Sequence, residues 1–168
     1  MTALELLSLL MLMHYPAANI DAEEAMCMVT NVYYETTGEP ISGQTAAAHL
    51  VLERANDPRY PDTICNVVKQ RKSKRKWRCS FSWYCDGKPD TIKLTRKDGS
   101  PIKENTAAFI EVAISSLDAM TGASLNPCPG ANFYYNPKIA NPRWSKIYTP
   151  VCEIGQHSFL RREYASLL

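Results

Sequence analysis

Residues 32–40 read V-Y-Y-E-T-T-G-E-P, a stretch in which a helical pattern reaches a carboxylate and stops. Upstream of it, apolar residues recur at three- and four-residue spacing, and Glu35 continues the line through Met28 and Val32. A glycine and a proline follow Glu35 and end the helix. The sequence therefore predicts a helix from about Asp21 that holds Glu35 on or beside its apolar face, at its C-terminal end.

The start of this helix carries a capping pattern. Asp21 can accept free backbone N–H groups of the first turn, and Glu24 stands at the capping-box position. Both helix ends are therefore marked in the sequence.

The remaining segments predict a mainly α (α+β) chain. Apolar spacing predicts three further helices, over residues 42–55, 63–68 and 105–121. A strand over 91–96 would belong to a small β or loop excursion near residues 79–101. From Asn126 onward the chain is rich in turn signals, so we expect loops there.

The N-terminal segment Leu6–Met13 is apolar except for Ser8. It is too short to span a bilayer, and it lacks the basic flank of a signal peptide. We expect residues 1–20 to form a helix that packs on one catalytic domain of residues 21–168. A weak export or release-type anchor is the alternative.

The charge of the chain is uneven. Its 168 residues suffice for one domain with a real core, and the net charge is only +2. Residues 69–78, K-Q-R-K-S-K-R-K-W-R, nevertheless hold seven of the nineteen Lys and Arg residues. A solvated loop is the simplest interpretation of this basic run. The alternatives are a patch that attracts the anionic cell envelope and a nucleic-acid-binding surface.

The six cysteines are many for a cytosolic enzyme of this size, and they favour disulfides in an oxidising compartment. Sequence alone does not choose among their pairings, but Cys79 and Cys85 are the tightest candidate. The three histidines lack metal-ligand spacing, so we expect no metal site, and no organic cofactor is indicated.

Glu35 is the candidate catalytic residue. A general acid keeps its proton at working pH, whereas a free glutamate with a pKa of about 4.3 is mostly ionised. The negative end of the helix dipole and apolar neighbours such as Val32 and Tyr33 disfavour the carboxylate and raise its pKa. A solvent-facing glutamate that closes the helix is the alternative. Glu39 lies in the following turn, where we expect its carboxylate to accept backbone N–H groups and support the structure.

Six segments of the chain carry a family resemblance. The first, Tyr33 to Arg54, is Y-Y-E-T-T-G-E-P-I-S-G-Q-T-A-A-A-H-L-V-L-E-R. The others are P-R-Y-P-D-T-I-C-N-V-V (58–68), F-S-W (81–83), A-N-F-Y-Y-N-P (131–137), P-R-W (142–144) and I-G-Q-H-S-F-L-R (154–161). In this order they resemble the spore-cortex-lytic cell-wall hydrolase family (SleB type), whose opening pattern is Y-x-E-A-x-G-E-P-x-x-G-Q. Several motifs in one order are far more specific than any one alone.

The resemblance implies a lysozyme-like, lytic-transglycosylase-like single domain that acts on the glycan strands of peptidoglycan. Such a domain cleaves the β-1,4 bond between N-acetylmuramic acid and N-acetylglucosamine. By motif position Glu35 is the acid, and in a transglycosylase it then serves as the base and gives a 1,6-anhydro product. A muramidase with two carboxylates needs the second at about 5 Å or about 6.5–9.5 Å. Glu53, Asp57 and Asp62 are available, but their context does not mark any of them.

Aromatic and polar residues in the matching loops are candidates for a saccharide groove. Rings pack on sugar faces, and hydroxyl, amide and indole groups form hydrogen bonds, although core burial is an equal alternative for the rings. His157 either supports the site or is a satisfied, partly buried histidine. The candidate substrate-binding residues are Phe81, Ser82, Trp83, Tyr134, Tyr135, Asn136, Trp144 and His157.

Three departures from the family pattern concern fine specificity. Thr36 replaces the usual alanine, the basic run is an insertion, and the cysteine content is high. The compact chain resembles a bacteriophage endolysin more than a spore protein. We therefore expect a monomer that is made in the cytoplasm of the bacterial host and acts in the periplasm or on the wall. The alternative function is a non-catalytic, disulfide-stapled module that binds the wall or nucleic acid.

Overall fold

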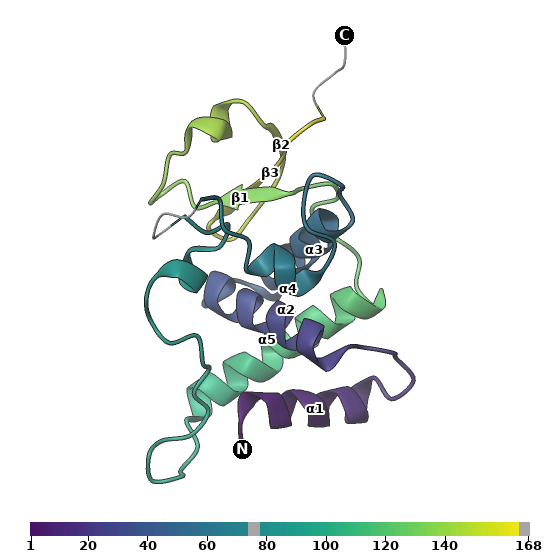
Figure 1. Ribbon diagram of the computed structural model, residues 1–168, viewed down its shortest axis with the longest axis vertical. Coiled ribbons are helices and arrows are strands. Elements are labelled where there is room, and N and C mark those ends of the chain that lie inside the picture. Colours follow the sequence, from purple (N-terminus) through teal and green to yellow (C-terminus); the bar gives the residue numbers. More distant parts are fainter. Residues whose placement is uncertain (74–77, 165–168) are drawn as a thin grey trace.

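Helix α2 (Ala22–Thr36) lies at the centre of the computed structural model, which describes residues 1–73 and 78–164 (Figure 1). It starts after the predicted N-cap, where the Asp21 carboxylate accepts the N–H of Glu24 at 2.9 Å. It ends before Gly38, whose φ of +85° is a left-handed conformation that glycine adopts without steric cost. The predicted bounds of the helix are confirmed, and Glu35 lies in its last turn.

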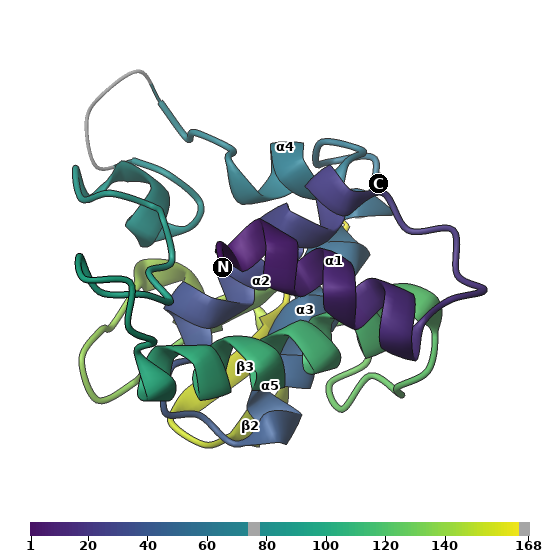
Figure 2. The ribbon, with the colours of Figure 1, turned by 90° about the horizontal axis from the view of Figure 1, so that it is seen from below.

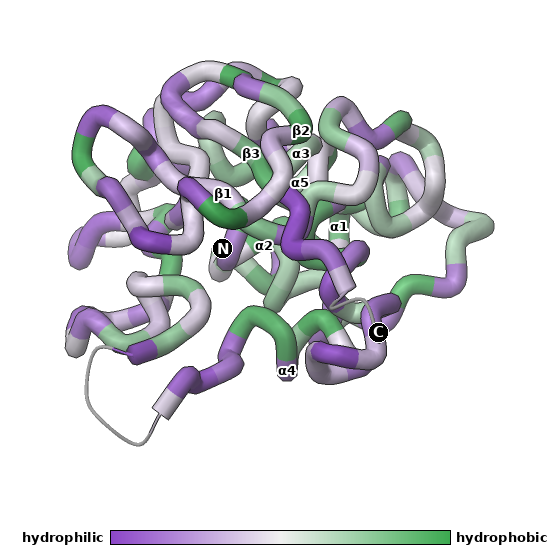
Figure 3. Tube along the Cα trace, turned by 90° about the horizontal axis from the view of Figure 1, so that it is seen from above, coloured by the Kyte–Doolittle hydropathy of each residue, from purple (hydrophilic) through white to green (hydrophobic). Residues whose placement is uncertain are grey.

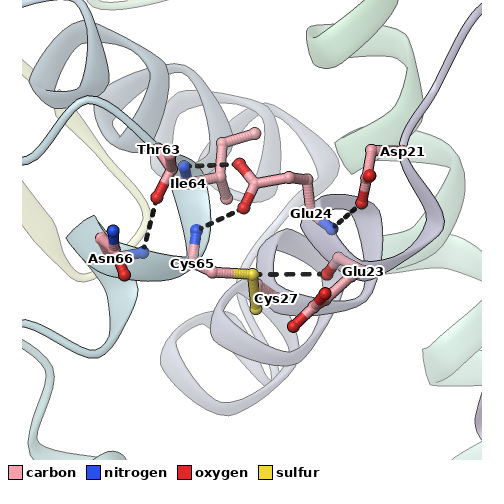
Figure 4. Close-up of a disulfide and its surroundings, with 8 residues drawn as sticks. All are labelled: Asp21, Glu23, Glu24, Cys27, Thr63, Ile64, Cys65 and Asn66. Atoms are coloured by element: carbon pink, nitrogen blue, oxygen red, sulfur yellow. Dashed lines mark hydrogen bonds between the residues drawn. A yellow bond between two sulfur atoms is a disulfide. The ribbon is translucent and has the colours of Figure 1, made fainter.

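The capping-box role predicted for Glu24 is wrong. Its carboxylate instead accepts the backbone N–H groups of Ile64 at 2.6 Å and Cys65 at 3.1 Å, in the first turn of α4 (Ile64–Val68) (Figure 4). The disulfide between Cys27 and Cys65 joins the same two helices. A covalent bond and a carboxylate that satisfies two free helix donors therefore hold the N-terminal ends of α2 and α4 together.

Helices α3 (Ile41–Ala55) and α5 (Lys103–Thr121) pack against α2, as Figures 1 and 2 show from two sides. Burial of their apolar faces is the main favourable term in this packing. The fully buried residues at the centre include Met28, Val29, Leu50, Val51, Phe109 and Leu117.

Helix α1 (Ala3–His14) packs on α5 and α2 through Leu7 and Leu10, which are buried. The Tyr15 hydroxyl, just after α1, donates to Asp118 Oδ1 of α5 at 2.6 Å. Outward-facing residues such as Leu12 stay exposed. None of the helices within residues 1–73 and 78–164 has the length and apolar character needed to cross a bilayer.

A three-stranded antiparallel sheet follows α5 and lies at one end of the helical layer (Figure 1). Its strand order is β1 (Phe133–Tyr135), β3 (His157–Arg161), β2 (Thr149–Ile154), and Tyr134 pairs with Phe159. The sequence predicted loops in this region. The error arises because β1 has only three residues and prolines interrupt the segments around it, so the two-residue period is too short to detect.

The sequence predicted a small β or loop excursion near residues 79–101, and the structure shows a loop there. It contains one short 3₁₀ helix, η1 (Ser82–Cys85), and its described backbone bridges join Arg71 to Cys79 and Thr95 to Pro101. The strand predicted over 91–96 is wrong, because alternate residues there insert into the helical core from an extended loop. The mainly helical class with a small β part is confirmed.

Two more disulfides fasten the loops around the sheet. Cys79 pairs with Cys85 and closes the segment that contains η1, which is the pair that spacing favoured. Cys128 pairs with Cys152 and ties the segment before β1 to β2. Each layer of the fold is therefore cross-linked to a loop or helix beside it.

The basic run is described in part. Residues 69–73 leave α4 as a hydrophilic stretch (Figure 3), and residues 74–77 lie outside the described residues. The Arg71 guanidinium lies 5.7 Å from the centroid of the Tyr84 ring, so the run contacts the η1 segment.

Candidate active site

Glu35 meets the sheet at Tyr134. The Tyr134 hydroxyl, from strand β1, donates a hydrogen bond to Glu35 Oε2. This contact joins the last turn of α2 to the sheet across 99 residues of sequence. Glu35 is half-buried, and its Oε1 atom has no hydrogen-bond partner among the residues that the structure describes. One carboxyl oxygen is therefore fixed and the other is available.

The surroundings of Glu35 favour its protonated form. Burial raises the pKa of Glu35, because a desolvated carboxylate is disfavoured. The hydrogen bond from Tyr134 and the positive charge of Arg54 lower it, since both stabilise the anion, but burial outweighs them. A raised pKa increases the protonated fraction near neutral pH, which is the state that a general acid needs.

Arg54, at the end of α3, is a residue of this site to which the sequence analysis gave no role. It is only 6% exposed, and its Nε atom donates to the Asn132 carbonyl oxygen at 2.7 Å. Its guanidinium lies 4.9 Å from the ring centroid of Phe133 and 5.3 Å from that of Phe81. A buried charge needs such partners, and this one holds the start of β1 against α3. The sequence did contain a signal for the burial of Arg54, because Arg54 lies one helical turn after Leu50 and so on the same buried face of α3.

Glu39 clamps the β2–β3 turn onto the end of α2. Its carboxylate accepts the N–H of Gln156 at 3.1 Å and lies 3.8 Å from His157 Nδ1. Gly155, in the same turn, has a φ of +56°, and a Cβ atom there would collide with the Glu39 carboxylate. The Glu39 side chain is only 6% exposed. The Glu39 carboxylate therefore accepts a backbone N–H group, as predicted. The donor belongs to the β2–β3 turn, however, and not to the turn in which Glu39 itself lies.

His157 stands behind Tyr134. The two rings meet edge to face with centroids 5.0 Å apart, so His157 supports the residue that contacts Glu35. Burial lowers the pKa of His157, and the charge of Glu39 opposes this shift. The neutral imidazole is therefore favoured at neutral pH.

Two of the predicted groove aromatics are core residues. Phe81 is 3% exposed beneath Arg54, so it has no face left for a sugar. Trp83 is 8% exposed, its ring stacks on Tyr34, and its Nε1 atom donates to Asn31 Oδ1 at 2.8 Å. The hydrogen-bonding role predicted for this indole is therefore already taken within the core. Ser82, between them, is exposed.

Tyr135 and Trp144 form a separate aromatic cluster. Trp144, in the 3₁₀ helix η2 (Arg143–Lys146), meets Tyr135 edge to face at 5.5 Å and stacks on Tyr148 at 5.5 Å. Neighbouring strand residues point to opposite faces, so Tyr135 turns away from the face that Tyr134 presents to Glu35. Asn136 Nδ2 donates to Gln156 Oε1 at 3.4 Å and lies nearer to the Glu39 clamp.

No contact with Glu35 is seen, among the residues that the structure describes, for the acidic residues that the sequence offered as a second carboxylate. Asp57 forms an ion pair with Arg59 at 2.7 Å. Glu53 and Asp57 together line a cavity of about 210 Å³ whose lining includes neither Glu35 nor Tyr134. Asp62 is exposed in the turn before α4. Glu35 is therefore the acid at the junction of helices and sheet that combines burial with a raised pKa.

Known proteins share both the sequence and the fold of this chain. The family model described as Cell Wall Hydrolase matches residues 38–160, a span that starts just after Glu35. The spore cortex-lytic enzyme of Halalkalibacterium halodurans is 31% identical over 86% of this chain and 36% of its own length. That of Bacillus subtilis is 27% identical over 76% of this chain and 34% of its own length. The chain spans about a third of the length of these two curated relatives.

Two solved structures share the fold. One is the catalytic domain of the germination-specific lytic transglycosylase SleB from Bacillus anthracis, with a TM-score of 0.62 and 24% identity. The alignment covers 86% of this chain and 100% of that one. The catalytic domain of the Bacillus cereus SleB protein has a TM-score of 0.59 and 25% identity, over 88% of this chain and 98% of that one. The lysozyme-like fold is therefore confirmed, and because the family model matches most of its length, this chain belongs to the cell wall hydrolase family.

Proposed function

We propose that this chain cleaves the β-1,4 bond between N-acetylmuramic acid and N-acetylglucosamine in peptidoglycan, with Glu35 as acid and then base. The observation that carries the proposal is the state of Glu35. It is a half-buried carboxyl with a raised pKa, pinned at Oε2 by Tyr134 and open at Oε1. Membership of the cell wall hydrolase family and the SleB-like fold support the same substrate class.

The chemistry follows from one carboxyl group. Protonated Glu35 gives its proton from Oε1 to the glycosidic oxygen as the bond from that oxygen to C1 of the muramic acid breaks. The resulting carboxylate takes the proton of the muramic acid 6-hydroxyl, whose oxygen forms the new bond to C1. The products are a 1,6-anhydro end and a free 4-hydroxyl, and Glu35 regains its proton. If water attacks in place of the 6-hydroxyl, the same residue gives a muramidase.

The contacts of the other carboxylates favour the transglycosylase. Asp57 is neutralised by Arg59, and Glu39 is held by the backbone of Gln156. A hydrolase with two carboxylates needs its second group within about 10 Å of the first, on the reacting side of the sugar. Tyr134, Asn136 and His157 are then the residues nearest to the reacting sugar, while Ser82, Tyr135 and Trp144 serve more distant sugar units.

The three disulfides support action outside the cytoplasm, because such bonds persist in oxidising compartments. We place residues 1–20 with residues 21–168 in one catalytic unit that works as a monomer on the wall. A role in phage lysis and contact of residues 69–78 with the anionic envelope stay predictions. Lysis of host cells by the chain, with and without a reducing agent, tests the first.

Mass spectrometry of digested peptidoglycan tests the reaction. The wild-type chain is expected to release anhydro-muramic ends, and Glu35→Gln is expected to lower the rate at least about a hundredfold. Glu104→Gln, at an exposed glutamate of α5, is the matched control and keeps the wild-type rate. Reducing ends would identify a muramidase. Freed peptides, or a fully active Glu35→Gln variant, would refute the proposal.

A further inference from the structure

A groove runs beside α2 along residues 23–30. Two cavities, of about 380 and 520 Å³, share Met26, Thr30 and Asp90 in their linings and so lie next to each other; together they are called the groove. Each volume lies within the range of roughly 300–1,000 Å³ that is usual for ligand sites. The groove lies between α2 and the extended segment 83–95, and it reaches the N-terminal turn of α1.

The lining of this groove combines an apolar floor with unpaired charges. Its floor includes Val68, Ile92 and Leu94, which are buried against the core. Glu23, Lys69 and Asp90 stand at its rim. Within residues 1–73 and 78–164, none of the three side-chain charges has an ion-pair partner or a side-chain hydrogen bond. A ligand with apolar groups and charges of both signs would complement this lining.

Neither cavity lining includes Glu35 or Tyr134, but one wall residue of the groove contacts the helical turn that holds Glu35. Trp83 forms part of its wall and stacks on Tyr34, with centroids 5.3 Å apart, and Tyr34 is the residue before Glu35. Burial and the charge of Asp90 both raise the pKa of Tyr34. A molecule in the groove would therefore contact Trp83, whose ring packs on the last turn of α2, beside Glu35.

We propose that this groove binds the peptide stem of the muramic acid residue at the cleavage site, an inference that rests on the proposed function. Stem peptides branch from muramic acid, the sugar whose C1 bond breaks, so a stem must leave the glycan strand beside Glu35. They carry alanine methyl groups, carboxylates and the amine of a diamino acid. The methyl groups match the apolar floor, the carboxylates match Lys69, and the amine matches Glu23 and Asp90.

Paired substrates test this assignment. One substrate is a peptidoglycan glycan strand that carries its stem peptides. The other is the same strand after an amidase has removed the stem peptides by cutting the bond between muramic acid and alanine. The wild-type chain is expected to show about tenfold higher kcat/KM on the strand with stems, which is the order of one hydrogen bond to a charged group. The double variant Lys69→Gln/Asp90→Asn is expected to lose this preference through KM, with kcat/KM on the stripped strand within about twofold of wild type.

The charge-matched control is Lys103→Gln/Glu104→Gln, two exposed residues of α5 outside the groove, which keeps the preference. Equal wild-type rates on the two strands would overturn the assignment. An equal loss on both strands in the groove variant would also overturn it, because the groove would then hold the glycan itself.

A binding measurement separates this inference from the proposed function. N-acetylmuramyl tripeptide is titrated into the full chain and followed by NMR. Shifts at Met26 and Thr30 that are absent from the groove variant are expected, and their absence from the wild-type chain would overturn the assignment. Because the probe contains no glycosidic bond to cleave, this result holds even if the chain cleaves neither strand, an outcome that would refute only the proposed function.

Discussion

The two ends of α2 carry glutamates in opposite surroundings. At the N-terminal end, the Glu24 carboxylate accepts two backbone N–H groups of α4 and lies beside the positive end of its own helix dipole. At the C-terminal end, Glu35 is half-buried, near the negative end of the dipole, and receives one hydrogen bond from Tyr134. The first carboxylate is occupied by two backbone donors, whereas burial raises the pKa of the second and favours its protonated form. The same side chain is therefore structural at one end and chemically useful at the other.

Exchanging each glutamate for glutamine tests this contrast most strongly. Glu35→Gln removes the transferable proton and is expected to lower kcat at least about a hundredfold, whereas Glu24→Gln leaves kcat within about twofold. The rate of release of soluble glycan fragments measures both. A comparable loss of kcat in the two variants would show that the ends of the helix do not differ in the way described.

Removal of the disulfide between Cys27 and Cys65 tests how much the N-terminal end of α2 contributes to the stability of the fold. The disulfide closes a loop of 38 residues, so Cys27→Ser/Cys65→Ser is expected to lower the free energy of unfolding by about 2–4 kcal/mol. Cys79→Ser/Cys85→Ser is the comparison, because its loop of 6 residues predicts a smaller loss. Urea denaturation measures both, and the reverse order would contradict the chain-entropy explanation.

Glu24→Ala examines the carboxylate without touching the disulfide. The N–H groups of Ile64 and Cys65 lose their partner, so we expect a loss of about 1–3 kcal/mol in the free energy of unfolding. Glu23→Ala is the matched control one residue earlier and is expected to change stability by less than about 0.5 kcal/mol. Equal effects of the two substitutions would refute the role of Glu24.

Tyr134→Phe tests how the hydroxyl of Tyr134 affects Glu35 at the C-terminal end of α2. The hydrogen bond from Tyr134 lowers the pKa of Glu35, so its loss raises that pKa further and moves the basic limb of the pH–rate profile to higher pH. The positioning of the carboxyl is lost as well, and we expect kcat to fall about tenfold. A rate profile that keeps its wild-type limb would show that the hydroxyl does not act on Glu35.

The pH dependence of stability gives the smallest effect. A folded pKa above the unfolded value means that Glu35 contributes stability that is fully present below the unfolded pKa and is lost as pH rises through the folded pKa. Above the folded pKa, Glu35→Gln is therefore expected to be slightly more stable than the wild-type chain. Thermal unfolding of both chains at a series of pH values checks this. If Glu35→Gln were more stable than the wild-type chain only at acidic pH, the prediction would be contradicted.

Local signals allowed both ends of α2 to be predicted, but not the partners of their glutamates. The apolar spacing and Asp21 gave the bounds of the helix, because both act within a few residues of the chain. The partners of Glu24 lie about 40 residues away in sequence and that of Glu35 lies 99 residues away. The capping-box error follows from this, since a local motif cannot show a competing donor that only the tertiary fold supplies.

The sheet and Arg54 show the same limit. β1 consists of three residues, so its alternation is too short to stand out from the turns around it. Arg54 lies in the recognised motif, but its role depends on the Asn132 carbonyl and on the ring of Phe133, which reach it only when β1 docks on α3. The position of Glu35 could be inferred from the sequence, whereas the residues around it required the structure.

Because Gly155 lies so close to the Glu39 carboxylate, the substitutions that position 155 tolerates depend on the residue at position 39. A Cβ atom at position 155 would collide with the Glu39 carboxylate and lie 3.0 Å from Pro40 Cδ, so a replacement there must displace that carboxylate and still meets the proline. A mutational scan should therefore find Gly155 intolerant, although Gly99, which has open space around it, accepts replacement more readily.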